Sequence, residues 1–242
     1  MSLLKNLTKN ENIKDEVEKD YIGGSKVLSS GLYTGLITLA YLTASASGAT
    51  GLVLEVKTAN DETIKQTLWM TSKAGKNYYE KDGKQHYLPG YLMAQSLITM
   101  LLNKSIDNVK LETKVVNIYN FESKDEVATK VEMITEILNK SITLGVIKQT
   151  VDKTAKGQDG QYKPTGEVRE ENEINKFFRA ADGKTNSEIL EEGSEATFIK
   201  TWESKWKDIV RDKTTKQVGG KNPSKPGTTA SKPSESLFDK DE

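Results

Sequence analysis

The amino-acid sequence predicts a mainly β domain with added helices, an α+β protein, followed by a disordered tail. Three stretches in the first half of the chain, residues 31–42, 50–58 and 62–71, alternate apolar and polar side chains. A period of two is typical of half-buried strands. An uninterrupted helix-like run then covers residues 91–103, and strand-like segments resume after it. This change of period separates the strands from a helix.

The first strand is predicted at residues 31–42, GLYTGLITLAYL, and small residues at 44–48 predict the turn after it. The second and third strands are separated by Asn60-Asp61, a turn signal. The apolar residues that alternation places on one face of these two strands are Leu52, Leu54, Val56, Ile64, Leu68 and Met70.

The helix is predicted to begin at Pro89-Gly90 and to stop near Asn103. Residues 171–181 and 196–212 are also predicted to be helical, with Ile199, Trp202, Trp206 and Ile209 packing on one face. Further strands are predicted at residues 114–121, 127–134 and 142–151.

The order of these elements predicts the architecture. Three strands, a helix and further strands are the order of a five-stranded OB-fold-like barrel with a helix between strands 3 and 4, although other small barrels share it. We expect a polar N-terminal arm at residues 1–25, the barrel with a helical C-terminal extension at residues 26–212, and a disordered tail at residues 213–242.

The tail is predicted from its composition. From Lys213 to Ser234 it is rich in Lys, Pro, Gly, Ser and Thr, and Val218 is its one large apolar residue. Such a segment cannot bury enough surface to offset chain entropy. Its end, SESLFDKDE, changes sign and is either a solubilising end or a functional one.

Charge and cysteine content exclude several classes of function. The chain has 35 basic and 35 acidic side chains, so it cannot coat nucleic acid through bulk charge, and a nucleic-acid site requires local charge separation. Without cysteine it forms neither disulfides nor thiolate metal sites. It shows no apolar run of membrane-span length and no secretory h-region, so we expect a soluble intracellular protein.

The segment Lys73–Tyr91, KAGKNYYEKDGKQHYLPGY, interleaves lysines with tyrosines. Lysines contact phosphates and flat rings stack on bases, a pattern typical of single-strand binders. The alternative is a solvated hairpin whose tyrosines cover the barrel end. A second basic stretch, Lys148–Lys163, either closes over a bound strand or is a solvated loop. The residues predicted to contact DNA are Trp69, Lys73, Lys76, Tyr78, Tyr79, Lys81, Lys84, Tyr87, Tyr91 and Lys148, with Tyr119 and Phe121 as second-rank candidates.

Enzyme motifs are weak. His86 is the one histidine, so a histidine-based metal cluster is excluded, and Phe178 occupies the first glycine position of the phosphate-loop pattern that ends at Gly183-Lys184-Thr185. Asp107, Glu112 and Lys114 faintly match a metal-dependent nuclease. We therefore predict no catalytic residue, no metal and no cofactor.

Several blocks resemble the single-stranded DNA-binding proteins of tailed bacteriophages. The resemblance covers about the first 210 residues. It rests on GLYTGLITLAYL, SASGA, TLWMTSKAGKNYY, DGKQHYLPGY, VVNIYNF, LGVIKQTVDKT, PTGEVREENEINKFFRA and EATFIKTW. It implies an OB-fold single-strand binder that acts in phage DNA replication and recombination, in the cytoplasm of the infected bacterium.

The resemblance also implies a tail that contacts replication partners, such as a phage or host DNA polymerase, helicase or RNA polymerase. Here Lys240 interrupts the acidic end. An alternative is a phage transcription cofactor that recruits RNA polymerase and binds single-stranded DNA secondarily. The tail residues expected to bind partners are Leu237, Phe238, Asp239, Asp241 and Glu242.

Overall fold

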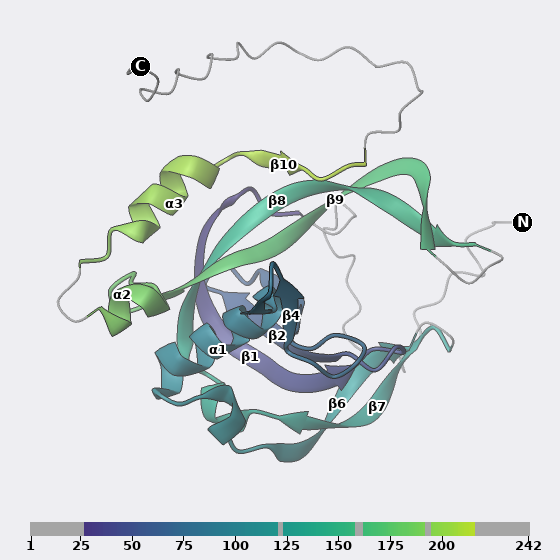
Figure 1. Cartoon of the computed structure of the whole chain (residues 1–242), viewed down its shortest axis with the longest axis horizontal. Helices are drawn as coiled ribbons and strands as arrows, with labels where there is room; N and C mark the ends of the chain where they lie inside the picture. Colours follow the sequence, from purple (N-terminus) through teal and green to yellow (C-terminus); the bar gives the residue numbers. More distant parts are fainter. Residues whose placement is uncertain (1–26, 121–122, 158–161, 192–194, 216–242) are drawn as a thin grey trace, which may run out of the picture.

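The computed structural model describes residues 27–120, 123–157, 162–191 and 195–215, and most of these residues lie in strands (Figure 1). Within this part of the chain no helix is long and apolar enough to cross a membrane. The strands are β1 (Gly31–Ala44), β2 (Thr50–Thr58), β3 (Thr63–Trp69), β4 (Tyr78–Lys81), β5 (Lys84–Tyr87), β6 (Glu112–Asn120), β7 (Asp125–Met133), β8 (Ser141–Lys156), β9 (Tyr162–Arg179) and β10 (Val210–Asp212). The helices are α1 (Pro89–Leu102), α2 (Asn186–Leu190) and α3 (Phe198–Trp206), with short 3₁₀ turns η2 (Ile106–Asn108) and η3 (Thr135–Ile137).

One large curved sheet forms the body of the protein. Its hydrogen-bonded order runs from β3 through β2 and β1 to β8, and β9 pairs with the far edge of β8. β10 adds to β8 in parallel beyond the part that pairs with β1. β6 and β7 form a hairpin that joins β1 through β7, and β4–β5 is a separate two-stranded sheet. Figure 1 shows α1 inside the arc that β1 and β8 describe.

The edges of the curved sheet, β3 and β9, are joined by a side chain rather than by a strand ladder. The Gln66 side chain accepts a hydrogen bond from the Ile174 backbone N–H at 2.5 Å and donates one to its carbonyl at 3.5 Å. The strands and helices of the structure confirm the predicted mainly β class with few helices. The sheet is open, however, so the backbone ladders do not form the closed five-stranded barrel that we expected.

The main core lies between the concave face of the sheet and α1. Leu52, Leu54 and Val56 of β2 pack there with Leu97 and Ile98 of α1, as the alternation predicted. A second, smaller core lies on the convex face, where the β6–β7 hairpin covers β1 and β2. Its buried residues are Tyr41, Val53, Val131 and Met133.

A β-bulge in β1 changes which residues of this strand face each core. The register with β2 shifts between Ile37 and Leu39, so Thr38 is the extra residue. Ile37 and Ala40 consequently both face the main core, while Tyr41 faces the second core. The simple alternation predicted for residues 31–42 is wrong after the bulge, because an inserted residue exchanges the two faces.

Residues 171–181 are not helical as predicted, because residues through Arg179 belong to β9. A register shift near Gly145 leaves Asn175 as an extra residue, so Ile174 and Phe177 face the same core three positions apart. This spacing imitates a helix in the sequence. The continuous ladder with β8 satisfies the backbone instead.

The predicted helix at residues 196–212 is shorter than expected. α3 ends at Trp206, Ile209 is 50% exposed, and β10 follows. Trp202 packs edge-on against Phe178, with ring centroids 6.2 Å apart. Beyond β10, Lys213 donates its backbone N–H to the Thr150 carbonyl, so the chain stays on β8 past the first residue of the predicted tail. Residues 1–26 and 216–242 lie outside the described residues.

Candidate nucleic-acid interface

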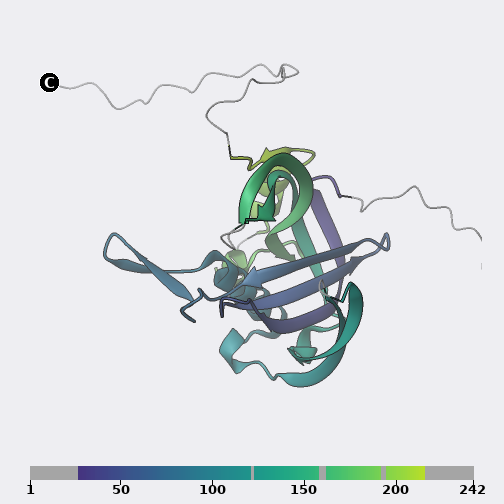
Figure 2. The same cartoon turned by 90° about the vertical axis from the view of Figure 1, so that its right-hand side faces the viewer.

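The β4–β5 hairpin carries most of the predicted contact residues. Its turn is Asp82-Gly83, with φ of 52° and 70°. A two-residue turn with positive φ at both positions favours Asp-Gly, so the local sequence specifies the hairpin. The hairpin projects from the body of the protein, at the left of Figure 2. Its side chains are therefore presented on two faces.

We call one side of the hairpin the cationic face. Tyr79 pairs across the strands with His86, and Lys81 with Lys84. Directly opposed residues point to the same face, and so do residues two apart along a strand. The rings of Tyr79 and His86 stack with centroids 5.5 Å apart. Two lysines, a tyrosine and a histidine therefore share this face without a carboxylate.

The opposite side is the tyrosine face. Tyr78 pairs with Tyr87, and Glu80 pairs with Gln85, whose amide donates to the carboxylate at 3.4 Å. The Tyr87 ring also meets the ring of Tyr91 on α1, with centroids 4.9 Å apart. This contact connects the hairpin to the body. Tyr87 is 54% exposed and Tyr79 is 45% exposed, so each hairpin face keeps a ring surface open to solvent.

The lysines of the segment carry charge that other described residues do not neutralise. Lys73, Lys76, Lys81 and Lys84 form no ion pair within the described part of the chain. The Lys76 ammonium instead lies 5.6 Å from the centroid of the Tyr78 ring. This is the local charge separation that a chain with zero net charge needs to attract a polyanion.

Trp69 lies close to the same end of the protein. Its indole covers Gly51 on the neighbouring strand, where an added Cβ would come within 2.9 Å of the ring. Its backbone touches Gly90, at the start of α1 and next to Tyr91. The indole is 44% exposed on the convex face. The structure thus brings Trp69 to the hairpin's base.

The remaining candidates lie elsewhere. Lys148 is on β8 and forms an ion pair with Glu170 at 2.8 Å, so it does not join the hairpin lysines. Tyr119 is half-exposed on β6, opposite Glu126. Phe121 and the five predicted tail residues lie outside the described residues. In the second basic stretch, Lys153 pairs with Glu167 at 2.9 Å.

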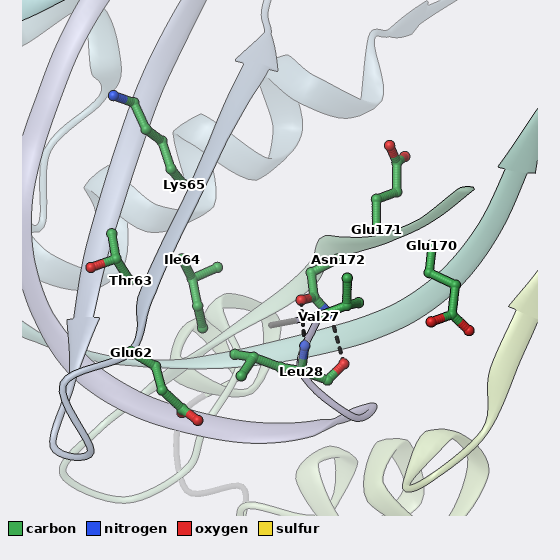
Figure 3. Close-up of a pocket in the computed structure, with 9 residues that line it drawn as sticks. All are labelled: Val27, Leu28, Glu62, Thr63, Ile64, Lys65, Glu170, Glu171 and Asn172. Carbon is green, nitrogen blue, oxygen red and sulfur yellow. Dashed lines mark hydrogen bonds between the residues drawn. The ribbon is translucent and has the colours of Figure 1, made fainter. Parts of the chain in front are cut away.

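A polar cavity of about 670 Å³ lies at the gap between β3 and β9 (Figure 3). The side chain of Asn172, which lines the cavity, accepts a hydrogen bond from the Leu28 backbone N–H and donates one to the Leu28 carbonyl, both at 2.8 Å. Its charged lining consists of Glu62, Glu170, Glu171 and Lys65. Lys65, the one cation in this lining, is paired with Glu55 at 3.6 Å, so the lining offers no unpaired cation to a phosphate chain.

The nuclease-like triplet does not form a metal site. The Glu112 carboxylate accepts from Thr135 at 2.7 Å and pairs with Lys114 at 2.8 Å, and these bonds lower its pKa. Asp107 lies on η2 instead of beside it. Within the described residues no group of three or more His, Cys, Asp or Glu side chains is placed to hold a metal ion.

Comparison with known proteins leaves the family open. No protein-family model matches the chain, and no curated protein has a significantly similar sequence. The likeness to phage single-stranded DNA-binding proteins therefore stays a prediction from the sequence blocks.

Proposed function

We propose that this protein binds single-stranded DNA without catalysing a reaction and largely without regard to sequence. The observation that carries the proposal is the cationic face of the β4–β5 hairpin. There Lys81 and Lys84, neither in an ion pair with another described residue, lie on the same face as the exposed ring of Tyr79, next to it toward the turn.

The chemistry of this face suits a single strand better than a duplex. Lysine ammonium groups contact phosphates of any nucleic acid, and binding then weakens as salt rises. Aromatic rings stack only on bases that are not already stacked and paired, and each stacked base contributes about 1–3 kcal/mol. Tyr79, Tyr87 and Trp69 are exposed enough to stack. The combination therefore favours an open strand.

We also propose that the curved sheet is an OB-fold variant. The chain order β1, β2, β3, α1, β8 and β9 supports this, because it places a helix between the third and fourth strands of a five-stranded order. In this view Gln66 replaces the ladder between β3 and β9, and the β6–β7 hairpin is an insertion. The proposed role in phage DNA replication and recombination, with recruitment of replication proteins through the tail, rests on the sequence resemblance alone.

The test is a titration of fluorescent oligo-dT at several salt concentrations. We expect affinity to fall as salt rises, and Lys81→Ala with Lys84→Ala to reduce the slope of log K against log salt by about 1.4, since each lysine–phosphate contact on a single strand contributes about 0.7. The control, Lys200→Ala with Lys207→Ala, removes one charge from α3 and one from the residue directly after it, and leaves the slope unchanged. Absence of oligo-dT binding at low salt would refute the function.

A tyrosine substitution tests the stacking surface separately. Tyr79→Ala is expected to weaken oligo-dT binding by about 5-fold to 150-fold, the equivalent of one lost stacking contact. Leu190→Ala is the control, because Leu190 is also exposed, at 66%, but lies on α2, outside both basic stretches. If both variants bind like the unsubstituted protein while oligo-dT binding persists, the assignment to the hairpin is wrong and the function stands.

A further inference from the structure

A second cavity, of about 410 Å³, opens beside the hairpin between β3, α1 and η2. Its walls are mostly apolar, and Met70, at the end of β3, is buried in them with 8% exposure. Its lining residues come from segments between Leu42 and Ile134 that are far apart in the chain, so no local pattern predicts the cavity. The lining consists of Leu42, Met70, Thr71, Gly75, Asn77, Tyr91, Ile106, Asp107, Val109, Leu111 and Ile134.

The cavity continues the tyrosine face of the hairpin. Asn77 lines it and also lines a neighbouring recess walled by Tyr78, Gln85 and Tyr87. Tyr91 stands at its wall, and its ring meets that of Tyr87 at 4.9 Å. A strand that is held on the cationic face and crosses onto the tyrosine face therefore passes the cavity at Asn77.

The polar groups of the cavity suit a base rather than a phosphate. Apolar walls with a few fixed polar groups, and a volume within about 300–1,000 Å³, are typical of small-ligand sites. The Asp107 carboxylate would repel a phosphate. It forms no hydrogen bond or ion pair with another described residue. Lys76 lies over the ring of Tyr78, which lines the neighbouring recess, so a cation is available to the phosphate outside the cavity. The flat, uncharged base can then enter the cavity while the charged phosphate of the same nucleotide stays outside.

We infer that this cavity takes one nucleobase of the bound strand, and that it prefers guanine. This inference rests on the proposed single-strand binding. A carboxylate has only acceptors, and guanine presents two adjacent donors, N1–H and the N2 amino group, which it can pair with both oxygens of Asp107. Thymine presents one N–H donor, and adenine and cytosine present one amino group each.

The first test compares oligo-dT of about 12 nucleotides, within the usual site size, with the same oligonucleotide carrying one central dG. We expect the dG oligonucleotide to bind at least about fivefold more tightly, the lower end for a bidentate base contact. Asp107→Asn should bring this ratio of affinities close to one, because the asparagine amide places an N–H donor opposite the N–H donors of guanine. The ratio is the readout, since loss of a negative charge by itself strengthens binding of any oligonucleotide.

Asp208→Asn is the matched control. It removes one carboxylate between α3 and β10 and should leave the ratio unchanged. A ratio near one in the unsubstituted protein, with oligo-dT still bound, overturns this inference and leaves the proposed function standing. Failure of both oligonucleotides to bind overturns both.

A structural readout locates the base. In protein labelled at methionine methyl carbons, the Met70 methyl resonance should shift on addition of the dG oligonucleotide, because Met70 lines the cavity. The Met93 methyl, which lines a different cavity with Phe177, should not shift. A bound dG oligonucleotide that leaves the Met70 methyl unmoved overturns the assignment to this cavity.

Discussion

Glu188 joins α2 to α3, and its replacement should have a large, pH-dependent effect on stability. Its carboxylate accepts from the backbone N–H groups of Thr185 and Phe198 at 2.8 Å and of Thr197 at 2.9 Å. Burial by itself would raise the pKa of Glu188. The backbone hydrogen bonds and the Thr185 hydroxyl outweigh burial and lower the pKa to about 2. The folded state therefore favours the ionised carboxylate.

The magnitude follows from the pKa change. A fall from 4.5 to about 2 corresponds to about 3 kcal/mol of folding free energy, at about 1.4 kcal/mol per pKa unit. Because the folded pKa is depressed, this stabilisation is complete above pH 4.5 and is lost as the pH falls toward 2. At pH 3 the unfolded chain already binds the proton while the folded protein mostly does not, so about 2 kcal/mol should be gone.

Glu188→Gln is the variant to measure, because it resembles a permanently protonated side chain. Denaturant unfolding should show it less stable than the unsubstituted protein by about 3 kcal/mol at pH 7 and by about 1 kcal/mol at pH 3. Other carboxylates titrate equally in both proteins and cancel in the difference. A difference that stays constant between pH 7 and pH 3 would refute the reasoning, since the charge of Glu188 would then contribute nothing.

Three further changes test the architecture and the interface. Gln66→Ala leaves the buried Ile174 backbone without its side-chain partners and should lower the free energy of unfolding by about 1–3 kcal/mol. Gly90→Ala places a Cβ 2.1 Å from the Trp69 carbonyl oxygen and should cost about 1–3 kcal/mol, measured in the same way. Trp69→Phe should remove most of the quenching of tryptophan fluorescence by oligo-dT, because Trp202 is only 3% exposed and Trp206, which is partly buried, lies away from the hairpin at the end of α3 with Arg211 5.7 Å from its ring.

Each of these changes has a control. Gln85→Ala removes an amide from the exposed hairpin and should leave stability unchanged. Gly31→Ala meets its nearest atom at 3.7 Å, an ordinary contact, so it should be tolerated where Gly90→Ala is not. Equal stability of the two alanine variants would contradict the close packing of α1 on β3. Undiminished quenching in Trp69→Phe would remove Trp69 from the interface.

Local patterns predicted the elements whose burial follows one period. The strand at residues 50–58 and the helix from Pro89 were predicted because each keeps one regular period toward the main core, even though Val53 on the other face of β2 enters the second core. Asn103, predicted as the stop of that helix, adopts φ of 53° directly after its last residue. These features depend on neighbours in the chain, so the sequence contains them.

The prediction from the sequence was wrong where pairing with distant strands changed the spacing of the buried residues. The bulge at Thr38 exchanges the two faces of β1, and the extra residue Asn175 gives a strand the spacing of a helix. Neither bulge is encoded by a turn residue. Both follow from the partner strand, since the ladder with β2 or β8 fixes which residues pair. Helix propensity at residues 171–179 yielded to the hydrogen bonds that β8 supplies.

For the interface, the sequence by itself determined the hairpin and its composition, because Asp82-Gly83 and the alternation of lysine with tyrosine are local. Only the tertiary structure decided which of these side chains share a face and that the Trp69 backbone packs against Gly90, next to Tyr91. The tertiary structure also decided that Lys148 lies apart from the hairpin lysines, in an ion pair with Glu170. The cavity behind Tyr91 depends wholly on tertiary structure, since β3, α1 and η2 are brought together by burial of the main core.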